Sequence, residues 1–189
     1  MWLTAAEARR VIAILSGLAA ILALAALATL AIKAAICLHL RWDTFAYHIP
    51  YAAARAGLDI PYEMNDRMRP AYQGYPPLPA LLQGVLWRLT GSMNATGVVN
   101  YLAFATFLAH AHRALRAPFW LVAIASLTAP LVVIHTAVSY IDLFGNCFLA
   151  IGACSCLSLY LFPERATRAA LIGGLSALSV AAWSKYLLV

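Results

Sequence analysis

The fold is decided by the stretch VIAILSGLAAILALAALATLAI at residues 11–32, which contains 22 residues and no charged side chain. At about 1.5 Å per residue in an α-helix, this run is about 33 Å long, which is enough to cross the hydrocarbon core of a bilayer. Arg9 and Arg10 precede it, as basic residues precede the apolar part of a signal peptide, but that part is normally only about 7–15 residues long. We therefore predict a retained membrane-spanning helix.

The composition of the whole chain is that of a membrane protein. Of its 189 residues, 64% are hydrophobic and only 11% are charged, whereas soluble domains contain about 45–50% apolar and about 25% charged residues. A soluble globular fold and a disordered chain are therefore excluded. The net charge of +6 comes from basic residues scattered between apolar runs. Such scattering is typical of loops that orient a membrane protein and not of a nucleic-acid-binding surface.

Several further apolar stretches predict an all-α, polytopic membrane protein. A shorter stretch at 77–89 is ambiguous, because only ten residues separate Pro77 from Arg88, too few for a clear span. It either crosses the membrane or lies at its surface. The predicted spans lie at about 11–33, 94–112, 118–138, 143–162 and 169–189.

Three pairs of arginines decide between these two topologies. If 77–89 does not cross, all three pairs lie on one face of the membrane, which the positive-inside rule makes cytoplasmic. If it does cross, the first pair is separated from the other two. We therefore place 77–89 as a juxtamembrane or re-entrant helix and predict five spans with a cytoplasmic N-terminus. The pairs are Arg9 with Arg10, Arg113 with Arg116, and Arg165 with Arg168.

The loop at 34–92, which this topology places on the outer face, differs from the other connections. It is long and contains acids, arginines and several tyrosines. Residues 44–55 predict a short helix that Gly57 closes, and the Pro76-Pro77 pair opens the next helix. Loops of this length usually carry function.

Three ionisable residues are expected on the same outer face, namely Asp43, Asp142 and Lys185. Ionisable groups in or beside membrane spans are candidates for function, because charge is costly there. Each also has a structural interpretation, since an aspartate before a helix can cap it and a lysine can extend to the interface. His48 is a further candidate, because it lies in the same loop five residues after Asp43.

Four motifs resemble a known enzyme family. The segment RWDTFAYHIP at 41–50 resembles the first periplasmic loop of the GT-C membrane glycosyltransferases. The closest branch is the bacterial one with aminoarabinose transferases and protein O-mannosyltransferase-like enzymes of the family 39 type. Further family motifs are matched, in the right order, by YPPL at 75–78, SYIDL at 139–143 and WSKY at 183–186. One departure is Tyr75, where some members have a histidine or lysine before the proline.

The resemblance implies transfer of a sugar from a polyprenyl-phosphate donor to an acceptor hydroxyl or amine, with inversion. It makes Asp43 the general base and Asp142 a second catalytic aspartate, which would orient the acceptor, hold a divalent cation or stiffen the site. Both aspartates would be metal ligands only if a divalent cation is used, and no other cofactor is implied. The residues expected to bind the substrates are Arg41, Tyr47, His48, Arg67, Arg69, Tyr75 and Lys185.

The same resemblance implies a location, partners and a missing part. We expect the bacterial inner membrane, a periplasmic active site, membrane lipid around the chain, and a glycan, lipid or protein as acceptor, with no nucleic acid. Family members are commonly longer, and this chain stops inside the apolar run that ends at Val189. We therefore expect 1–189 to be the N-terminal part of a GT-C transmembrane domain, which would be inactive alone. The alternative is a last span that ends at the terminus.

A non-enzymatic function is the competing hypothesis. A transporter half or an assembly partner of a larger transferase would use Asp43, Asp142 and Lys185 as part of an ion or substrate pathway. Transporters often contain paired internal repeats with broken helices near the middle of the membrane. The sequence contains no convincing repeat, and the acids are expected at the interface instead of the middle of spans.

Overall fold

The computed structural model describes residues 4–38, 40, 42–60, 62, 77–165 and 167–184, and these parts of the chain are helices and short connections without a strand. The predicted all-α fold class is therefore confirmed. In chain order the elements are α1 (Ala5–Ile36), the π-helical turn η1 (Thr44–His48), α2 (Ile49–Ala56), α4 (Pro77–Thr90), the 3-10 turn η3 (Met93–Gly97), α5 (Val98–Leu115), α6 (Phe119–Leu127), α7 (Pro130–Thr136), α8 (Asp142–Leu161), the 3-10 turn η4 (Pro163–Arg165) and α9 (Arg168–Ala182).

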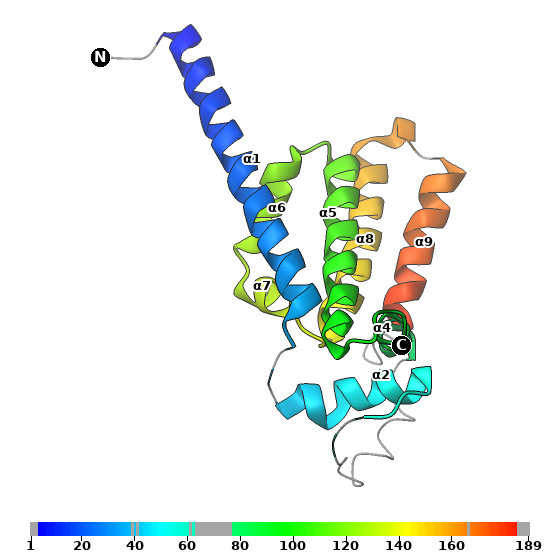
Figure 1. Ribbon diagram of the computed structural model, residues 1–189. Coiled ribbons are helices and arrows are strands. Elements are labelled where there is room, and N and C mark those ends of the chain that lie inside the picture. Colours follow the sequence, from blue (N-terminus) through cyan, green and yellow to red (C-terminus); the bar gives the residue numbers. More distant parts are fainter. Residues whose placement is uncertain are drawn as a thin grey trace.

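The long helices form a bundle whose lower end is covered by α2 and α4 (Figure 1). Within the bundle α5 packs against α8, and α8 packs against α9, while α1 contacts α6 and the start of α5. The core between these helices is made of Phe104 and Leu108 from α5, Ala123 from α6, and Phe144 and Cys147 from α8. The bundle therefore places the connections at its lower end beside α2 and α4.

Two of the described helices, α1 and α8, are long and apolar enough to cross a membrane, and the bent pair α6–α7 would make a third span. This is fewer than the five predicted spans. α5 is less apolar because it carries Asn100 near its start and His110 and His112 near its end. α9 has only 15 residues in the described part of the chain. The apolar helices indicate a membrane protein, but only part of the predicted polytopic arrangement.

The predicted span 118–138 is not one helix. It forms α6 and α7, which meet at an angle of 97°. Pro130 causes the break, because proline lacks the backbone N–H of a helical residue and disfavours helical backbone angles in the residue before it. Ala129 accordingly has extended angles of φ −84° and ψ 110°. The apolar composition continues through this break, so hydropathy alone did not indicate it.

The loop 34–92 contains the two helices expected from its sequence. The first begins at Thr44 as the turn η1, continues as α2, and ends at Gly57, whose φ of 63° is the left-handed conformation that closes helices. The second, α4, begins at Pro77. The π-helical geometry of η1 was not predicted. Such π-turns are rare and are often found at functional sites.

The upper end of the bundle collects the connections that carry the arginine pairs. The N-terminal end of α1 and the α5–α6 and α8–α9 connections all lie there (Figure 1). Arg116 and Glu164 join the latter two connections through an ion pair of 3.0 Å. The three arginine-bearing segments therefore share one end of the bundle (Figure 1).

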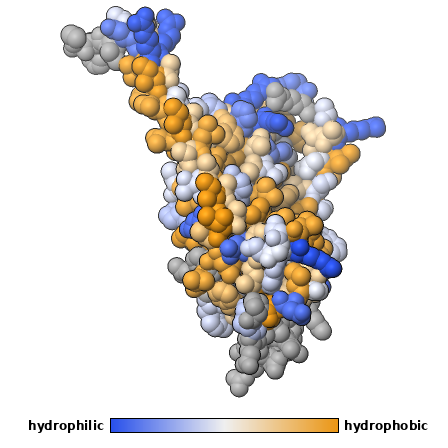
Figure 2. Space-filling view, viewed as in Figure 1, coloured by the Kyte–Doolittle hydropathy of each residue, from blue (hydrophilic) through white to orange (hydrophobic). Residues whose placement is uncertain are grey.

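The first half of α1 projects away from the other helices (Figure 1). Its first buried residue is Ala23, and large apolar side chains such as Ile12, Ile14 and Leu22 are more than 60% exposed. Figure 2 shows this apolar surface along α1, with hydrophilic residues at its N-terminal end. Such a surface suits a lipid environment.

Candidate functional site

Two of the predicted motifs meet at the lower end of the bundle. The Tyr140 hydroxyl donates a hydrogen bond of 3.3 Å to Oδ2 of Asp43, although the two residues are 97 positions apart in the sequence. Asp43 precedes η1, and Tyr140 lies in the connection between α7 and α8. Both side chains are half-buried. The fold therefore joins the motif at 41–50 to the motif at 139–143.

A group of three rings, His48, His135 and Tyr140, lies beside Asp43, and we call it the ring cluster. The imidazole of His48 stacks on the Tyr140 ring with centroids 4.8 Å apart and an angle of 27° between the planes. His135 meets the same ring edge-on at 5.4 Å and 87°. Tyr47 is a further neighbour, 4.4 Å from His48. Tyr140 is thus held by one histidine on its face and by another histidine edge-on.

His48 is buried and neutral. Its side chain is only 4% exposed, and burial lowers its pKa from 6.5 to about 4. The carboxylates of Asp142 and Asp43 raise that pKa and His135 lowers it further, but burial outweighs the carboxylates. The Nδ1 atom of His48 has no hydrogen-bond partner in the described part of the chain. His48 is therefore a buried imidazole whose pKa both predicted aspartates influence, and its Nδ1 atom is unsatisfied in the described part of the chain.

Neither aspartate serves as the helix cap considered from the sequence. Asp43 occupies the N-cap position of η1 but makes no side-chain capping hydrogen bond. Asp142 is the first residue of α8, and Ile141 occupies the cap position instead. In the described part of the chain, Asp43 therefore makes no capping hydrogen bond and Asp142 does not occupy the cap position.

Buried amide side chains hold the connection that carries Tyr140. Asn100 of α5 donates through Nδ2 to the backbone oxygens of Val138, at 2.7 Å, and of Tyr140. Gln83 of α4 donates through Nε2 to the backbone oxygen of Ser139 at 2.6 Å. Both amides are completely buried, so their hydrogen bonds are shielded from competing water. Two different helices, α4 and α5, thereby fix the backbone at Tyr140.

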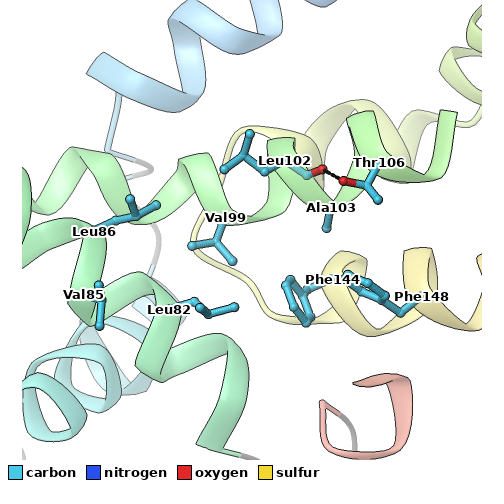
Figure 3. A pocket seen from close by; sticks show the side chains of 9 residues that line it. All are labelled: Leu82, Val85, Leu86, Val99, Leu102, Ala103, Thr106, Phe144 and Phe148. Atoms are coloured by element: carbon cyan, nitrogen blue, oxygen red, sulfur yellow. Dashed lines mark hydrogen bonds between the residues drawn. The ribbon is translucent and has the colours of Figure 1, made fainter. Parts of the chain in front are cut away.

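An apolar groove of about 290 Å³ lies beside this connection, between α4, α5 and α8. Figure 3 shows side chains from all three helices converging on it, with Phe144 and Phe148 along one side. Its single hydroxyl, on Thr106, already donates to the backbone oxygen of Leu102. Leu82 and Val99 in its wall directly precede Gln83 and Asn100. The lining residues are Leu82, Val85, Leu86, Val99, Leu102, Ala103, Thr106, Phe144 and Phe148.

A metal site finds no support in the ranges that the structure describes. No group of three or more His, Cys, Asp or Glu side chains is arranged there to hold a metal ion. The role of Asp43 and Asp142 as ligands of a divalent cation stays a prediction.

The structure places four of the predicted site residues, namely Asp43, Tyr47, His48 and Asp142, around one end of the bundle. Sequence reasoning did not assign Tyr140, His135, Asn100 or Gln83 to the site. A signal was available for Tyr140, since it lies within the SYIDL motif two residues before Asp142. The remaining predicted residues, Arg41, Arg67, Arg69, Tyr75 and Lys185, lie outside the described residues.

Comparison with known proteins returns no match among protein-family models, curated proteins or solved structures.

Proposed function

We propose that the chain belongs to a membrane glycosyltransferase that transfers a sugar from a polyprenyl-phosphate donor to an acceptor hydroxyl or amine. The observation that carries this proposal is the hydrogen bond between Tyr140 and Asp43. It joins two segments that resemble motifs of the GT-C family. Asp142 lies in the same region, where its carboxylate raises the pKa of His48.

In this reaction Asp43 is the general base. The acceptor oxygen or nitrogen attacks the anomeric carbon from the side opposite the phosphate, and the bond from that carbon to the phosphate oxygen breaks. The acceptor proton passes to the Asp43 carboxylate, and polyprenyl phosphate leaves with the bonding electrons. A base must come within about 2.6–3.2 Å of the atom whose proton it takes. The half-buried position of Asp43 leaves its carboxylate reachable by an acceptor.

The other site residues have roles that follow from their charge. Asp142 would accept hydrogen bonds from further acceptor hydroxyls and so orient the acceptor. The phosphate leaving group gains charge as its bond breaks, and cations stabilise such charge best when they are already in position. We assign this role to the basic residues predicted for the site, Arg41, Arg67, Arg69 and Lys185.

The apolar groove supports a lipid-linked donor. Apolar cavities lined by Leu, Ile and Phe stay dry and take up apolar ligands even at about 150 Å³, and this groove has about 290 Å³. A hydrocarbon chain lying in it would end near the connection that carries Tyr140 and Asp142.

The proposal includes a location. The active site would face the periplasm at the bacterial inner membrane, with the N-terminus in the cytoplasm. The isoprenoid chain would remain in or beside the lipid while the sugar reaches the acceptor, which is a glycan, a lipid or a protein.

The test is a transfer assay on the full-length protein in nanodiscs with a panel of polyprenyl-phosphate sugars. We expect Asp43→Asn to lower transfer by about 100-fold or more, because the amide cannot take the proton. Asp59→Asn is the matched control, since Asp59 is an exposed carboxylate of the same loop, and it should retain wild-type turnover. Preserved turnover in a well-folded Asp43→Asn variant would remove Asp43 from the role of base.

A further inference from the structure

We propose that Tyr140 is a positioning residue that fixes the orientation of the Asp43 carboxylate, and that the histidines of the ring cluster hold Tyr140 for this purpose. The inference rests on the proposed function, because it concerns the general base of that reaction. It adds Tyr140 and His135, to which the resemblance assigns no role. It rests on the hydrogen bond from Tyr140 to Asp43, on the two contacts of the Tyr140 ring with the histidines, and on the two buried amides that bind the backbone at this connection.

The first step concerns the carboxylate itself. The terminal torsion of an aspartate has a broad energy profile, so packing alone selects no single orientation of its two oxygens. The hydrogen bond from the Tyr140 hydroxyl to Oδ2 selects one. A base that is displaced by about 1 Å can lose about 100-fold in rate, because proton transfer depends on alignment. A donor that fixes the carboxylate therefore contributes to turnover without touching the substrate.

The second step concerns the tyrosine. Its ring is held by the stacked His48 on its face and by His135, which meets it edge-on. Its backbone oxygen and that of Ser139 accept hydrogen bonds from Asn100 and Gln83, which belong to two different helices. Contacts with the bundle thus fix the position of the Tyr140 hydroxyl group, whereas Asp43 lies in the loop after α1. Through its hydrogen bond to Asp43, Tyr140 restrains this loop relative to the bundle.

A purely structural role would make different predictions. If Tyr140 only fills space between the loop and the bundle, its ring matters and its hydroxyl does not. Tyr140→Phe keeps the ring between the two histidines and removes only the hydroxyl. The comparison of Tyr140 with Phe therefore isolates the hydrogen bond to Asp43.

The experiment measures kcat and KM of the full-length protein in nanodiscs for Tyr140→Phe in two backgrounds, with Asp43 intact and with Asp43→Glu. Asp43→Glu retains a carboxylate but moves it by one methylene. We expect Tyr140→Phe to lower kcat about tenfold with little change in KM when Asp43 is intact, because a hydrogen bond to a charged group is lost. In the Asp43→Glu background the same change should cost less than about twofold, because the interacting pair is already broken. Tyr160→Phe, at an 82% exposed tyrosine in the last turn of α8, is the control and should leave kcat unchanged.

The outcomes separate this inference from the proposed function. Full turnover in Asp43→Asn would show that the proposed function is wrong, and the positioning role would be wrong with it. An inactive Asp43→Asn together with wild-type kcat in Tyr140→Phe would overturn the positioning role alone. Equal losses from Tyr140→Phe in both backgrounds would overturn it too, because the hydroxyl would then act independently of Asp43.

Discussion

At the scale of single residues, His48 combines features that rarely occur together. It lies among carboxylates that favour its charged form, yet burial keeps its pKa well below the usual range. In the unfolded chain the same imidazole would have a pKa near 6.5. The unfolded state therefore binds a proton between about pH 4 and 6.5 that the folded state does not bind. Stability must then rise with pH across this window.

We expect His48→Gln to remove this part of the pH dependence. A pKa difference from 6.5 to about 4 corresponds to about 3 kcal/mol in the free energy of unfolding. The wild-type protein should have this stabilisation above pH 6.5 and lose it as the pH falls toward 4. Thermal melting in detergent at several pH values measures it, and the groups that face His48, namely Asp43, Asp142 and His135, are retained in both proteins. Parallel pH profiles for the two proteins would contradict the prediction.

The residues of the site were predictable only where the sequence placed them in a motif. Asp43, His48 and Asp142 could be selected because a charged group or an imidazole beside an apolar run is energetically costly and is therefore a candidate for function. Gln83 and Asn100 could not, because a buried amide is recognisable only from the backbone oxygens that it binds. Those oxygens belong to a connection that is distant in sequence from both amides.

At the scale of helices, the contact between α2 and α4 depends on Gly84. A Cβ atom at this position would lie 2.2 Å from the backbone oxygen of Ala52 and 2.7 Å from Cβ of Ala56. Neither of these atoms is the end of a flexible side chain, so the two helices would have to separate. Because α2 continues directly from η1, the close packing of α4 against α2 also determines the position of His48 in the ring cluster.

Gly84→Ala should lower the free energy of unfolding by about 1–3 kcal/mol, the usual cost of overpacking. Gly173→Ala is the matched control, because nothing lies within 4 Å of a Cβ atom there. In that helix alanine should raise stability by about 0.5–1 kcal/mol, since it loses less backbone freedom than glycine. Melting temperatures of the two variants in the same detergent show whether each substitution raises or lowers stability. A destabilisation of equal size at both positions would mean that close packing at Gly84 is not the cause.

Helix boundaries in the loop were predicted better than the integrity of a span. Gly57 and Pro77 act through backbone preferences that are local, so their effects are visible in the sequence. Pro130 offered the same kind of signal, but the apolar run around it continues without interruption. Hydropathy reports which environment a segment prefers and says nothing of its continuity. The π-helical geometry of η1 was not indicated by the sequence.

At the scale of the whole molecule, the arginine pairs predicted which connections share one end of the bundle. The N-terminal end of α1 and the two arginine-bearing connections lie together at one end of the bundle (Figure 1), as the charge pattern required. The number of helices that cross a membrane follows less directly, because α5 and α9 fall short in apolar character or length.

Cysteine accessibility in membrane vesicles tests the five-span arrangement. In a cysteine-free background, Ala5→Cys and Ala117→Cys should react with an impermeant thiol reagent from one side of the membrane. Asp59→Cys and Ser92→Cys, which flank α2 and α4, should react only from the other side. Labelling of position 59 and position 117 from the same side would show that the number of crossings between them is even, against the five-span arrangement.

The unequal support of α1 has a mechanical consequence. This helix has 32 residues and is therefore about 48 Å long, whereas the hydrocarbon core of a bilayer is about 30 Å thick and long helices adapt to it by tilting. Its lower half packs on the bundle through Leu30 and Ala34, and its upper half acts as a lever in the lipid. A short connection joins its lower end to Asp43. A bilayer that changes the tilt of α1 is therefore expected to move Asp43 relative to Tyr140, which the bundle holds.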